Sequence, residues 1–168
     1  SSKKMSPNLV IEVLSPDFRG NLDHLDTLLE SGLDVFSQNI ETVERLTHPV
    51  RDLRAGYNQT LRVLRHASDK GFLSKSGMML GLGEDKDEII KTMKDLHQNG
   101  VKILTLGQYL RPTINHLPVK KYIHPDEFAE YSEIGKDIGI DEVVAGPLIR
   151  SSYRADKAFM KIEENKHV

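Results

Sequence analysis

The sequence predicts an α/β fold in which parallel strands and helices form a partial TIM-type (βα) barrel. Short β-branched runs alternate with amphipathic stretches about four times along the chain, at intervals long enough for parallel crossovers. Each strand-like run ends in a polar cluster, and a (βα) barrel assembles its site from such carboxyl-terminal strand ends. A complete eight-fold barrel takes about 250 residues, so we expect these 168 residues to form only part of one.

Composition and charge narrow the class of protein. With 38% hydrophobic and 29% charged residues, residues 1–168 are expected to form a single globular domain. A net charge of -2 gives no reason to expect nucleic acid or a membrane surface as a partner. No apolar run approaches the roughly 20 residues of a membrane span, and no signal-peptide pattern is present. We therefore expect an intracellular protein, and the start at Ser1 rather than Met leads us to expect a lost upstream part.

The amino-terminal half of the chain contains two strand-like runs and two amphipathic stretches. The runs are rich in β-branched residues and end at turn-forming residues, as strands do. The amphipathic stretches place leucines at helical spacing and are followed by glycine, which commonly ends a helix. The predicted elements are a strand over 9–14, a helix after the capping residue Asn21, a strand over 33–36 and a helix over 57–70.

The carboxyl-terminal half repeats this alternation with the clearest helix of the chain. That helix has a buried stripe of isoleucine, methionine and leucine and ends at Gly100. Pro125 stands where a helix tolerates proline, in its first turn. The predicted elements are a strand over 73–80, a helix over 84–99, a strand over 101–106, a helix from Pro125, a strand over 143–145 and a helix over 153–162.

A glycine-rich motif, Gly77-x-Met79-x-Gly81-x-Gly83-Glu84, joins a predicted strand to the start of the clearest helix. Glycine lets the backbone approach a ligand closely, and the helix amino terminus favours negative charge. The same residues also suit a tight turn with Glu84 and Asp85 as helix caps. The spacing alone does not choose between these two interpretations, although it does exclude a P-loop because no Gly-Lys-Ser/Thr follows.

Other polar groups follow the strands, and each has a structural alternative. Asn39 and Glu41 suit either a ribose hydroxyl pair or a helix start, and their chemistry alone slightly favours the helix start. Arginines in the 51–62 region suit carboxylate binding, but most arginines are simply solvated. The tail Arg150-Ser151-Ser152-Tyr153 suits a helix cap. The seven histidines lack metal-ligand spacing and are interpreted as structural: His24, His48, His66, His97, His116, His124 and His167.

Taken together, these segments resemble the carboxyl-terminal half of the lipoyl synthase family of radical S-adenosylmethionine (SAM) enzymes. The matching stretches cover nearly the whole chain in family order. The most specific are Leu106-Gly107-Gln108-Tyr109-Leu110-Arg111-Pro112-Thr113 and Arg150-Ser151-Ser152-Tyr153. These two continue stretches that begin at Leu104-Thr105 and at Gly146-Pro147-Leu148-Ile149. The others are Glu12-Val13-Leu14-Ser15-Pro16-Asp17-Phe18-Arg19-Gly20, Gly32-Leu33-Asp34-Val35-Phe36, Asn39-Ile40-Glu41-Thr42-Val43, Val50-Arg51-Asp52-Leu53-Arg54-Ala55, Ser74-Lys75-Ser76-Gly77 and Met79-Leu80-Gly81-Leu82-Gly83-Glu84.

The resemblance implies a fold and a chemistry. The fold is a partial, six-stranded (βα) barrel of the radical SAM type, here truncated on its amino-terminal side. The family inserts sulfur at C6 and C8 of octanoyl-lysine on lipoyl-domain proteins, namely 2-oxoacid dehydrogenase E2 subunits and the glycine cleavage H protein. One [4Fe–4S] cluster cleaves SAM reductively to a radical that abstracts hydrogen, and a second cluster is the sulfur donor. Ferredoxin or flavodoxin is the implied electron donor. The implied location is the bacterial cytoplasm, or the mitochondrion in a eukaryote.

The resemblance also implies roles for particular residues. Cofactor-binding residues are Asn39, Glu41, Gly77, Met79, Gly81, Glu84, Gln108 and Tyr109, with the glycine motif at the adenine. Arg111 and Arg54 are implied substrate contacts. Arg150 and Ser152 are the catalytic residues. A serine of the tail, Ser152 in preference to Ser151, is the unusual ligand of the sulfur-donating cluster, because an alkoxide is a more labile ligand than thiolate.

One departure from the family is large. The cluster cysteines belong to the family's other half, and this chain has no cysteine, so alone it is expected to be inactive. Three hypotheses follow. The chain is an amino-terminally truncated lipoyl synthase; or it is a split or non-catalytic half-barrel that binds SAM, a nucleotide or a lipoyl domain; or it is an unrelated half-barrel that binds a phosphorylated metabolite. The retained polar strand ends favour the first.

Overall fold

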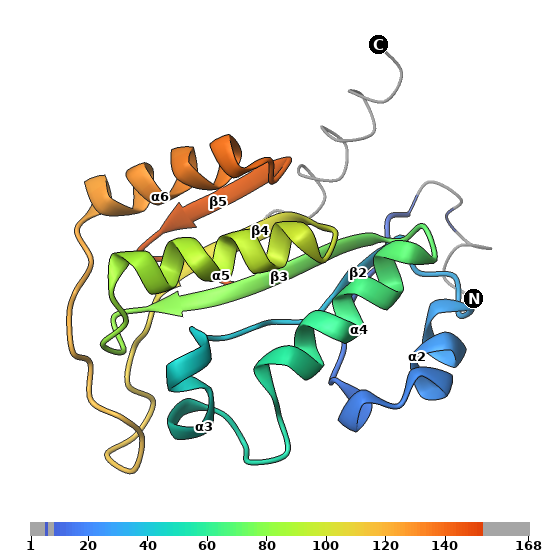
Figure 1. The fold of residues 1–168 in the computed structure, drawn as a ribbon, viewed down its shortest axis with the longest axis horizontal. Helices are drawn as coiled ribbons and strands as arrows, with labels where there is room; N and C mark the ends of the chain where they lie inside the picture. Colours follow the sequence, from blue (N-terminus) through green and yellow to red (C-terminus); the bar gives the residue numbers. More distant parts are fainter. Residues whose placement is uncertain (1–5, 7–8, 153–168) are drawn as a thin grey trace.

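A five-stranded, fully parallel sheet forms the centre of the molecule (Figure 1). The computed structural model describes residue 6 and residues 9–152. The strands pair in the order of the chain, β1-β2-β3-β4-β5. This order is that of a barrel wall, whereas a doubly wound sheet would reverse its order at a switch point. The strands are β1 (Glu12–Leu14), β2 (Val35–Ser37), β3 (Leu73–Leu80), β4 (Val101–Gln108) and β5 (Glu142–Gly146).

Helices connect the strands and pack on one face of the sheet. Their apolar side chains form a single large core with alternate residues of the strands, such as Phe36, Leu80 and Leu104. None of the described helices is both long and apolar enough to cross a membrane. The helices are α2 (Leu22–Leu29), α3 (Thr47–Val50), α4 (Tyr57–Asp69), α5 (Lys86–Gln98) and α6 (Pro125–Ile138), with 3-10 turns η1 (Phe18–Gly20) and η2 (Glu44–Leu46).

The predicted α/β partial barrel is confirmed, with differences at the ends of elements. The strand predicted over 9–14 is paired only over β1, and the helix predicted from residue 84 begins at Lys86 because Asp85 is its N-cap in a capping box. Strand β4 continues to Gln108, which pairs with Leu80. The 3-10 turn and short helix over 44–50 were not predicted, and the helix predicted over 153–162 lies outside the described residues.

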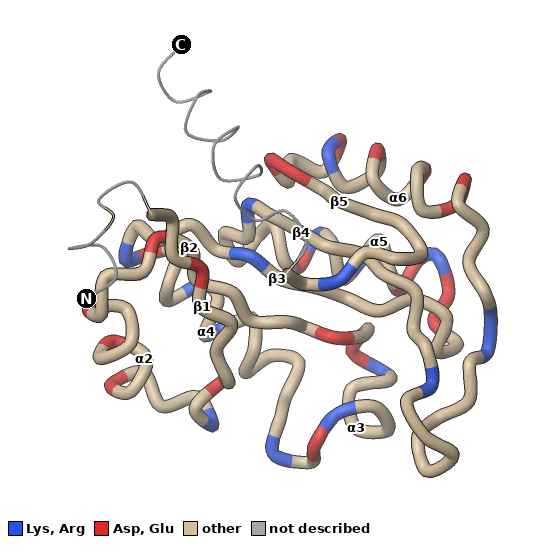
Figure 2. The backbone as a smooth tube through the Cα atoms, turned by 180° about the vertical axis from the view of Figure 1, so that it is seen from behind, with Lys and Arg blue, Asp and Glu red and all other residues tan. Residues whose placement is uncertain are grey.

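Strands β1 and β3 carry a pair of oppositely charged residues, Glu12 and Lys75 (Figure 2). Side chains alternate between faces along a strand, so Lys75 and Gly77 point away from the core residues Met78 and Leu80. Lys75 is fully buried, and its Nζ donates to both carboxylate oxygens of Glu12 at 2.9 and 3.0 Å. This ion pair joins β1 to β3 across β2, two residues along β3 from Gly77.

Candidate functional site

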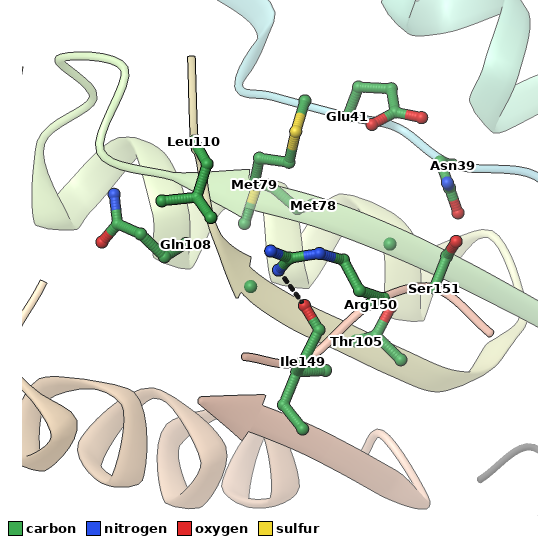
Figure 3. A pocket seen from close by; sticks show the side chains of 12 residues that line it. Asn39, Glu41, Met78, Met79, Thr105, Gln108, Leu110, Ile149, Arg150 and Ser151 are labelled. Atoms are coloured by element: carbon green, nitrogen blue, oxygen red, sulfur yellow. Dashed lines mark hydrogen bonds between the residues drawn. The ribbon is translucent and has the colours of Figure 1, made fainter. Parts of the chain in front are cut away.

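A cavity of about 310 Å3 opens beside the carboxyl-terminal halves of β3 and β4 (Figure 3). It is bounded by the segment after β2 on one side and by the segment after β5 on the other. Parallel strands bring their carboxyl ends to one edge of the sheet, which is where (βα) folds bind ligands. The lining residues are Asn39, Glu41, Gly77, Met78, Met79, Thr105, Gly107, Gln108, Leu110, Ile149, Arg150 and Ser151.

The segment that follows β2 reaches the cavity through a β-bulge. Residues 37–41 lie opposite residues 75–78, because Ser37 pairs with Lys75 and Glu41 with Met78. The extra residue leaves the backbone N–H of Ile40 without a strand partner, and it donates to the Ser76 hydroxyl at 3.1 Å instead. Bulges redirect side chains beside active sites. Asn39 and Glu41 therefore belong to a bulge, and the helix start that their chemistry alone favoured is wrong.

Glu41 has a backbone conformation that is rare for a residue with a side chain. Its φ angle is 68°, in the left-handed region that costs roughly 1–2 kcal/mol for an L-residue. Two hydrogen bonds hold it there: its N–H donates to Gly77 O at 3.0 Å, and its carbonyl accepts from Met79 N at 2.9 Å. Strain that the surrounding structure enforces is concentrated at functional sites, which supports a role for Glu41.

The bulge also concentrates polar atoms that lack partners. Burial raises the pKa of the Glu41 carboxyl, against the opposing effects of the Asn39 amide and the Arg51 guanidinium. Buried polar atoms normally have a hydrogen-bond partner, so an unpaired cluster indicates a missing ligand or water. Among the described residues, the buried side-chain oxygens without a partner are Ser37 Oγ, Gln38 Oε1, Asn39 Oδ1 and Thr42 Oγ1, all from this one segment.

Two glycines in the wall of the cavity allow neighbouring groups to pack closely against the strands. A Cβ atom on Gly77 would lie 2.8 Å from Thr105 Oγ1 and 2.9 Å from Asn39 Oδ1, closer than van der Waals contact allows. A Cβ atom on Gly107 would overlap the carbonyl group of Ile149. Neither position needs a positive φ angle, so space alone requires glycine at both. The segment over 149–151 therefore lies directly against the backbone of β4.

The glycine-rich motif divides into two parts with different roles. Gly77 and Met79 line the cavity, whereas Gly81 and Glu84 do not. The Glu84 carboxylate accepts from the backbone N–H groups of Gly81 and Leu82, the latter at 2.9 Å. Gly81 has a φ angle of 104°, as a tight turn requires. The spacing alone was compatible with either a ligand contact or a tight turn. In the structure the Glu84 side chain forms the tight turn.

Gln108 and Tyr109 occupy different environments. Gln108 borders the cavity, but its Nε2 donates to three carbonyl groups, of Leu80 at 3.1 Å, Tyr109 at 3.0 Å and Lys121 at 3.1 Å. Its Oε1 accepts from Ile123 N at 2.9 Å, so the amide is fully used in holding the chain. Tyr109 faces a neighbouring cavity of about 400 Å3, which shares Met79 and Leu110 with the first.

The arginines predicted as substrate contacts do not line the first cavity. Arg54 is exposed and forms a bidentate pair with Asp52. The Arg54 guanidinium holds the pKa of the Asp52 carboxyl well below its usual range. Arg111 donates to the carbonyl groups of Ile114 and His116 in its own loop. Arg51 is better placed than its sequence environment indicated, because it lines a third cavity, of about 330 Å3, on the other side of Asn39 and Glu41.

The tail after β5 brings two of its predicted residues to the first cavity. Arg150 and Ser151 line it, whereas Ser152 is exposed and does not (Figure 3). Arg150 Nη1 donates to the carbonyl group of Ile149 at 2.8 Å. Tyr153 lies outside the described residues. Within those residues, no group of three or more His, Cys, Asp or Glu side chains is arranged to hold a metal ion.

Several lining residues were not predicted from the sequence. Three of them have ordinary side chains that carry no catalytic signal: Thr105, Leu110 and Ile149. The register of β4 against β3 and β5 places Thr105, and the segments that follow β4 and β5 bring Leu110 and Ile149 to the cavity. Leu110 lies inside a highly specific family stretch, which was the one sequence signal that pointed to it.

Comparison with known proteins identifies the superfamily of the chain. The Radical SAM superfamily profile matches residues 2–96. Curated lipoyl synthases match over 161 residues, or 95% of this chain: that of Legionella pneumophila (strain Corby) is 56% identical and that of Thermus thermophilus 53%. A chloroplastic lipoyl synthase of Ricinus communis is 54% identical. The chain spans 49%, 50% and 44% of these three proteins, about half their length.

A solved structure shares the fold at low identity. Hydroxymethylglutaryl-CoA lyase from Pseudomonas aeruginosa matches with a TM-score of 0.54 and 16% identity, over 82% of this chain and 44% of that one. This likeness concerns the fold alone. The superfamily profile covers more than half of the chain, and its matched region contains β1, β2, β3 and the bulge that carries Asn39 and Glu41. The chain therefore belongs to the radical SAM superfamily, and its curated relatives there are lipoyl synthases.

Proposed function

We propose that this chain forms the carboxyl-terminal half of a lipoyl synthase and provides one wall of its SAM-binding and reaction chamber. The observation that carries the proposal is the cavity beside Gly77 and Thr105, bordered by the unpartnered amide oxygen of Asn39 and by the side chain of Glu41, whose backbone is strained. The identity of 53–56% to lipoyl synthases over 95% of the chain supports the same function.

The residues of the cavity fit SAM. Asn39 and Glu41 offer an amide and a carboxylate for a ribose hydroxyl pair or the methionyl group. Gly77 and Met79 offer backbone and an apolar side chain for the adenine ring, and no side chain of Gly77 covers that backbone. SAM, when bound and reduced, supplies the radical that abstracts hydrogen from the substrate. The protein groups bind and orient the reactants and exclude water, as is usual in cofactor enzymes.

In this proposal, four of the implied cofactor-binding residues support the walls of the cavity from behind: Gly81, Glu84, Gln108 and Tyr109. Glu84 and Gly81 fix the turn after β3, and the Gln108 amide fixes the start of the loop after β4. They therefore position Met79 and Leu110 and need not touch SAM through their side chains. Arg150, beside the cavity, is placed to contact the substrate or the sulfur-donating cluster. Arg54 and Arg111, which lie on exposed loops outside the cavity, are proposed as further substrate contacts.

The residues of this chain do not fit an iron–sulfur cluster by themselves. Such clusters are held by thiolates, and the 168 residues include no cysteine. We therefore propose that both [4Fe–4S] clusters depend on cysteines outside this sequence, and that the isolated chain is inactive. Ser152, or the neighbouring Ser151, is the one cluster ligand proposed from this chain.

The proposal extends to partners and location. The substrates are octanoylated lipoyl domains of 2-oxoacid dehydrogenase E2 subunits and the glycine cleavage H protein, and the electron donor is a ferredoxin or flavodoxin. The location is the cytoplasm of a bacterium or the mitochondrion of a eukaryote.

A chimera tests this function directly. The 168 residues replace the matching half of one of the curated lipoyl synthases, which then supplies the cysteines, and lipoyl formation on an octanoylated lipoyl domain is followed by mass spectrometry. We expect lipoyl formation, and a large loss when Asn39 is changed to alanine. A folded chimera with both clusters that produces no lipoyl group would contradict the proposal and favour a non-catalytic half-barrel.

A further inference from the structure

The loop that joins β4 to α6, residues 109–124, is unusually long for a compact domain. Loops longer than about 12–15 residues without helix or strand are uncommon and are usually functional. This loop lies at the same end of the molecule as α3, beyond the carboxyl ends of the strands (Figure 1). We call it the β4–α6 loop.

The tip of the β4–α6 loop is held in one shape by its own hydrogen bonds. Arg111 Nε donates to His116 O at 2.8 Å, and the Thr113 hydroxyl lies 2.8 Å from His116 Nδ1. Further along, the Tyr109 hydroxyl donates to Leu117 O at 2.9 Å. A surface that is ordered before binding loses less conformational entropy when a partner binds. The loop is therefore built as a preformed surface.

The chemistry of this surface is basic and apolar. The β4–α6 loop contains no Asp or Glu, although the chain as a whole has a net charge of -2. Lys120 is exposed and makes no ion pair among the described residues, whereas Lys121 is paired with Glu127 of α6. Ile114, at the tip, is 82% exposed, and Tyr122 is 73% exposed. Figure 2 shows the cations of this loop at the edge of the molecule.

The surface adjoins the candidate site. Leu110 lines both the first cavity and the neighbouring 400 Å3 cavity, and residues 115–118 line the second. The opposite rim of the second cavity is formed by Pro49 and Val50 of α3. Leu53, which follows shortly after, is 83% exposed. A protein bound across the two rims would lie over the second cavity.

We propose that the β4–α6 loop, together with Leu53, is the docking surface for an acidic protein domain that presents its lysine-linked acyl chain to the cavity. This inference rests on the proposed function and deepens it by assigning the surface that recognises the carrier domain. Lys120 attracts acidic side chains of the carrier, and Ile114 and Leu53 supply the apolar contact. Charged groups at an interface rim mainly direct association and choose partners.

Binding of a carrier domain to this chain tests the proposal without turnover. A fluorescently labelled octanoylated lipoyl domain with net negative charge is titrated with the chain and with Lys120→Glu and Ile114→Ser variants. Each substitution is expected to weaken binding roughly 3- to 10-fold. The effect of Lys120→Glu is expected to shrink as salt is raised, because salt screens exposed charges. The control is Lys94→Glu, the same charge change at an exposed position of α5, which is expected to leave binding unchanged.

Turnover in the chimera separates docking from chemistry. With the octanoylated domain, Lys120→Glu is expected to raise KM roughly 3- to 10-fold at unchanged kcat. With a short octanoyl-lysine peptide, which cannot reach the loop, KM is expected to stay the same. Domain binding that neither variant weakens would overturn the docking surface, as would an equal rise in KM for peptide and domain. A chimera that is inactive on both substrates would count against the proposed function, and the titration would still decide the docking surface.

Discussion

At the scale of single residues, the candidate site is marked by Glu41, which stability alone would not favour. Its backbone lies in the left-handed region, and its carboxyl group is partly buried and forms no ion pair with another described residue. A glycine would remove the strain, and a neutral side chain would remove the cost of burying charge. Groups that are kept at such a cost are typical of binding sites.

Changing Glu41 to glutamine should separate stability from binding. Burial raises the folded-state pKa of Glu41, so this group stabilises the fold below the ordinary glutamate pKa and that contribution is lost as pH rises through the folded pKa. The variant should therefore be more stable than the parent at pH 7 in urea unfolding, and the difference should vanish towards pH 4. SAM affinity, measured by calorimetry, should fall about 10-fold or more.

If the Glu41→Gln variant and the parent differ in stability by the same amount at pH 7 and at pH 4, the Glu41 carboxyl has the same pKa in the folded and unfolded states. That result would contradict the prediction. Asp52→Asn is a suitable comparison, because the pKa of Asp52 is lowered by Arg54 and the sign of its pH dependence is opposite.

The two serines of the tail give a second prediction at this scale. In the active chimera, Ser152→Ala should abolish lipoyl formation while cleavage of SAM persists, if the Ser152 oxygen is the cluster ligand. Ser151→Ala is the matched variant, one residue nearer the cavity that Ser151 lines. Unchanged lipoyl formation in Ser152→Ala with loss in Ser151→Ala would transfer the ligand role to Ser151. Unchanged formation in both would exclude the tail as a ligand.

At the scale of elements, the sequence predicted the helices and strands whose bounds depend on local sequence patterns. Strand β3 and helix α4 have the expected bounds to within one residue, because each is a local run, buried in β3 and amphipathic in α4, that a glycine follows within two residues. The bulge after β2 was not predicted, since it depends on the register against β3 and on the Ser76 hydroxyl replacing a backbone acceptor. Asn39 and Glu41 were therefore singled out from the sequence, but the helix start that their chemistry favoured was the wrong local structure.

The buried pair of Lys75 and Glu12 yields a prediction about how the strands are held together. Lys75→Met would leave the mostly buried Glu12 carboxylate without its partner and should lower the free energy of unfolding by about 3 kcal/mol. The double variant with Glu12→Leu should recover most of this loss, because an apolar pair of similar volume often replaces a buried ion pair without cost. Urea unfolding of the single and double variants measures both effects.

The exposed pair of Lys102 and Asp141 serves as the control for this cycle. Lys102→Met should cost no more than about 0.5 kcal/mol, since exposed ion pairs contribute little. If the double variant at positions 12 and 75 is as unstable as Lys75→Met, the pair is needed for more than its charge, and the β1 strand depends on it for its place in the sheet.

At the scale of the whole molecule, parallel topology explains which site residues were predictable. Polar residues at strand ends were expected to converge, and Asn39, Glu41, Gly77, Met79, Gln108, Arg150 and Ser151 do line one cavity. What the sequence did not reveal is which polar groups are already engaged. The Gln108 amide and the Glu84 carboxylate are taken up by backbone groups that only the folded loops bring near them. The family resemblance pointed to these residues. The packing shows which of them line the cavity and which hold the backbone of a neighbouring loop.

The open sheet leads to the last prediction. Among the described strands, β1 and β5 each pair on one side only, and an unpaired edge offers N–H and C=O groups to another chain. The isolated chain should therefore self-associate in a concentration-dependent way in light scattering. Val144→Lys, at a half-buried position of β5, should reduce this association because a charged residue on an edge strand opposes strand pairing. A chain that stays monomeric at all concentrations would mean that its edges are covered within the chain, and that the half-barrel is a self-sufficient fold.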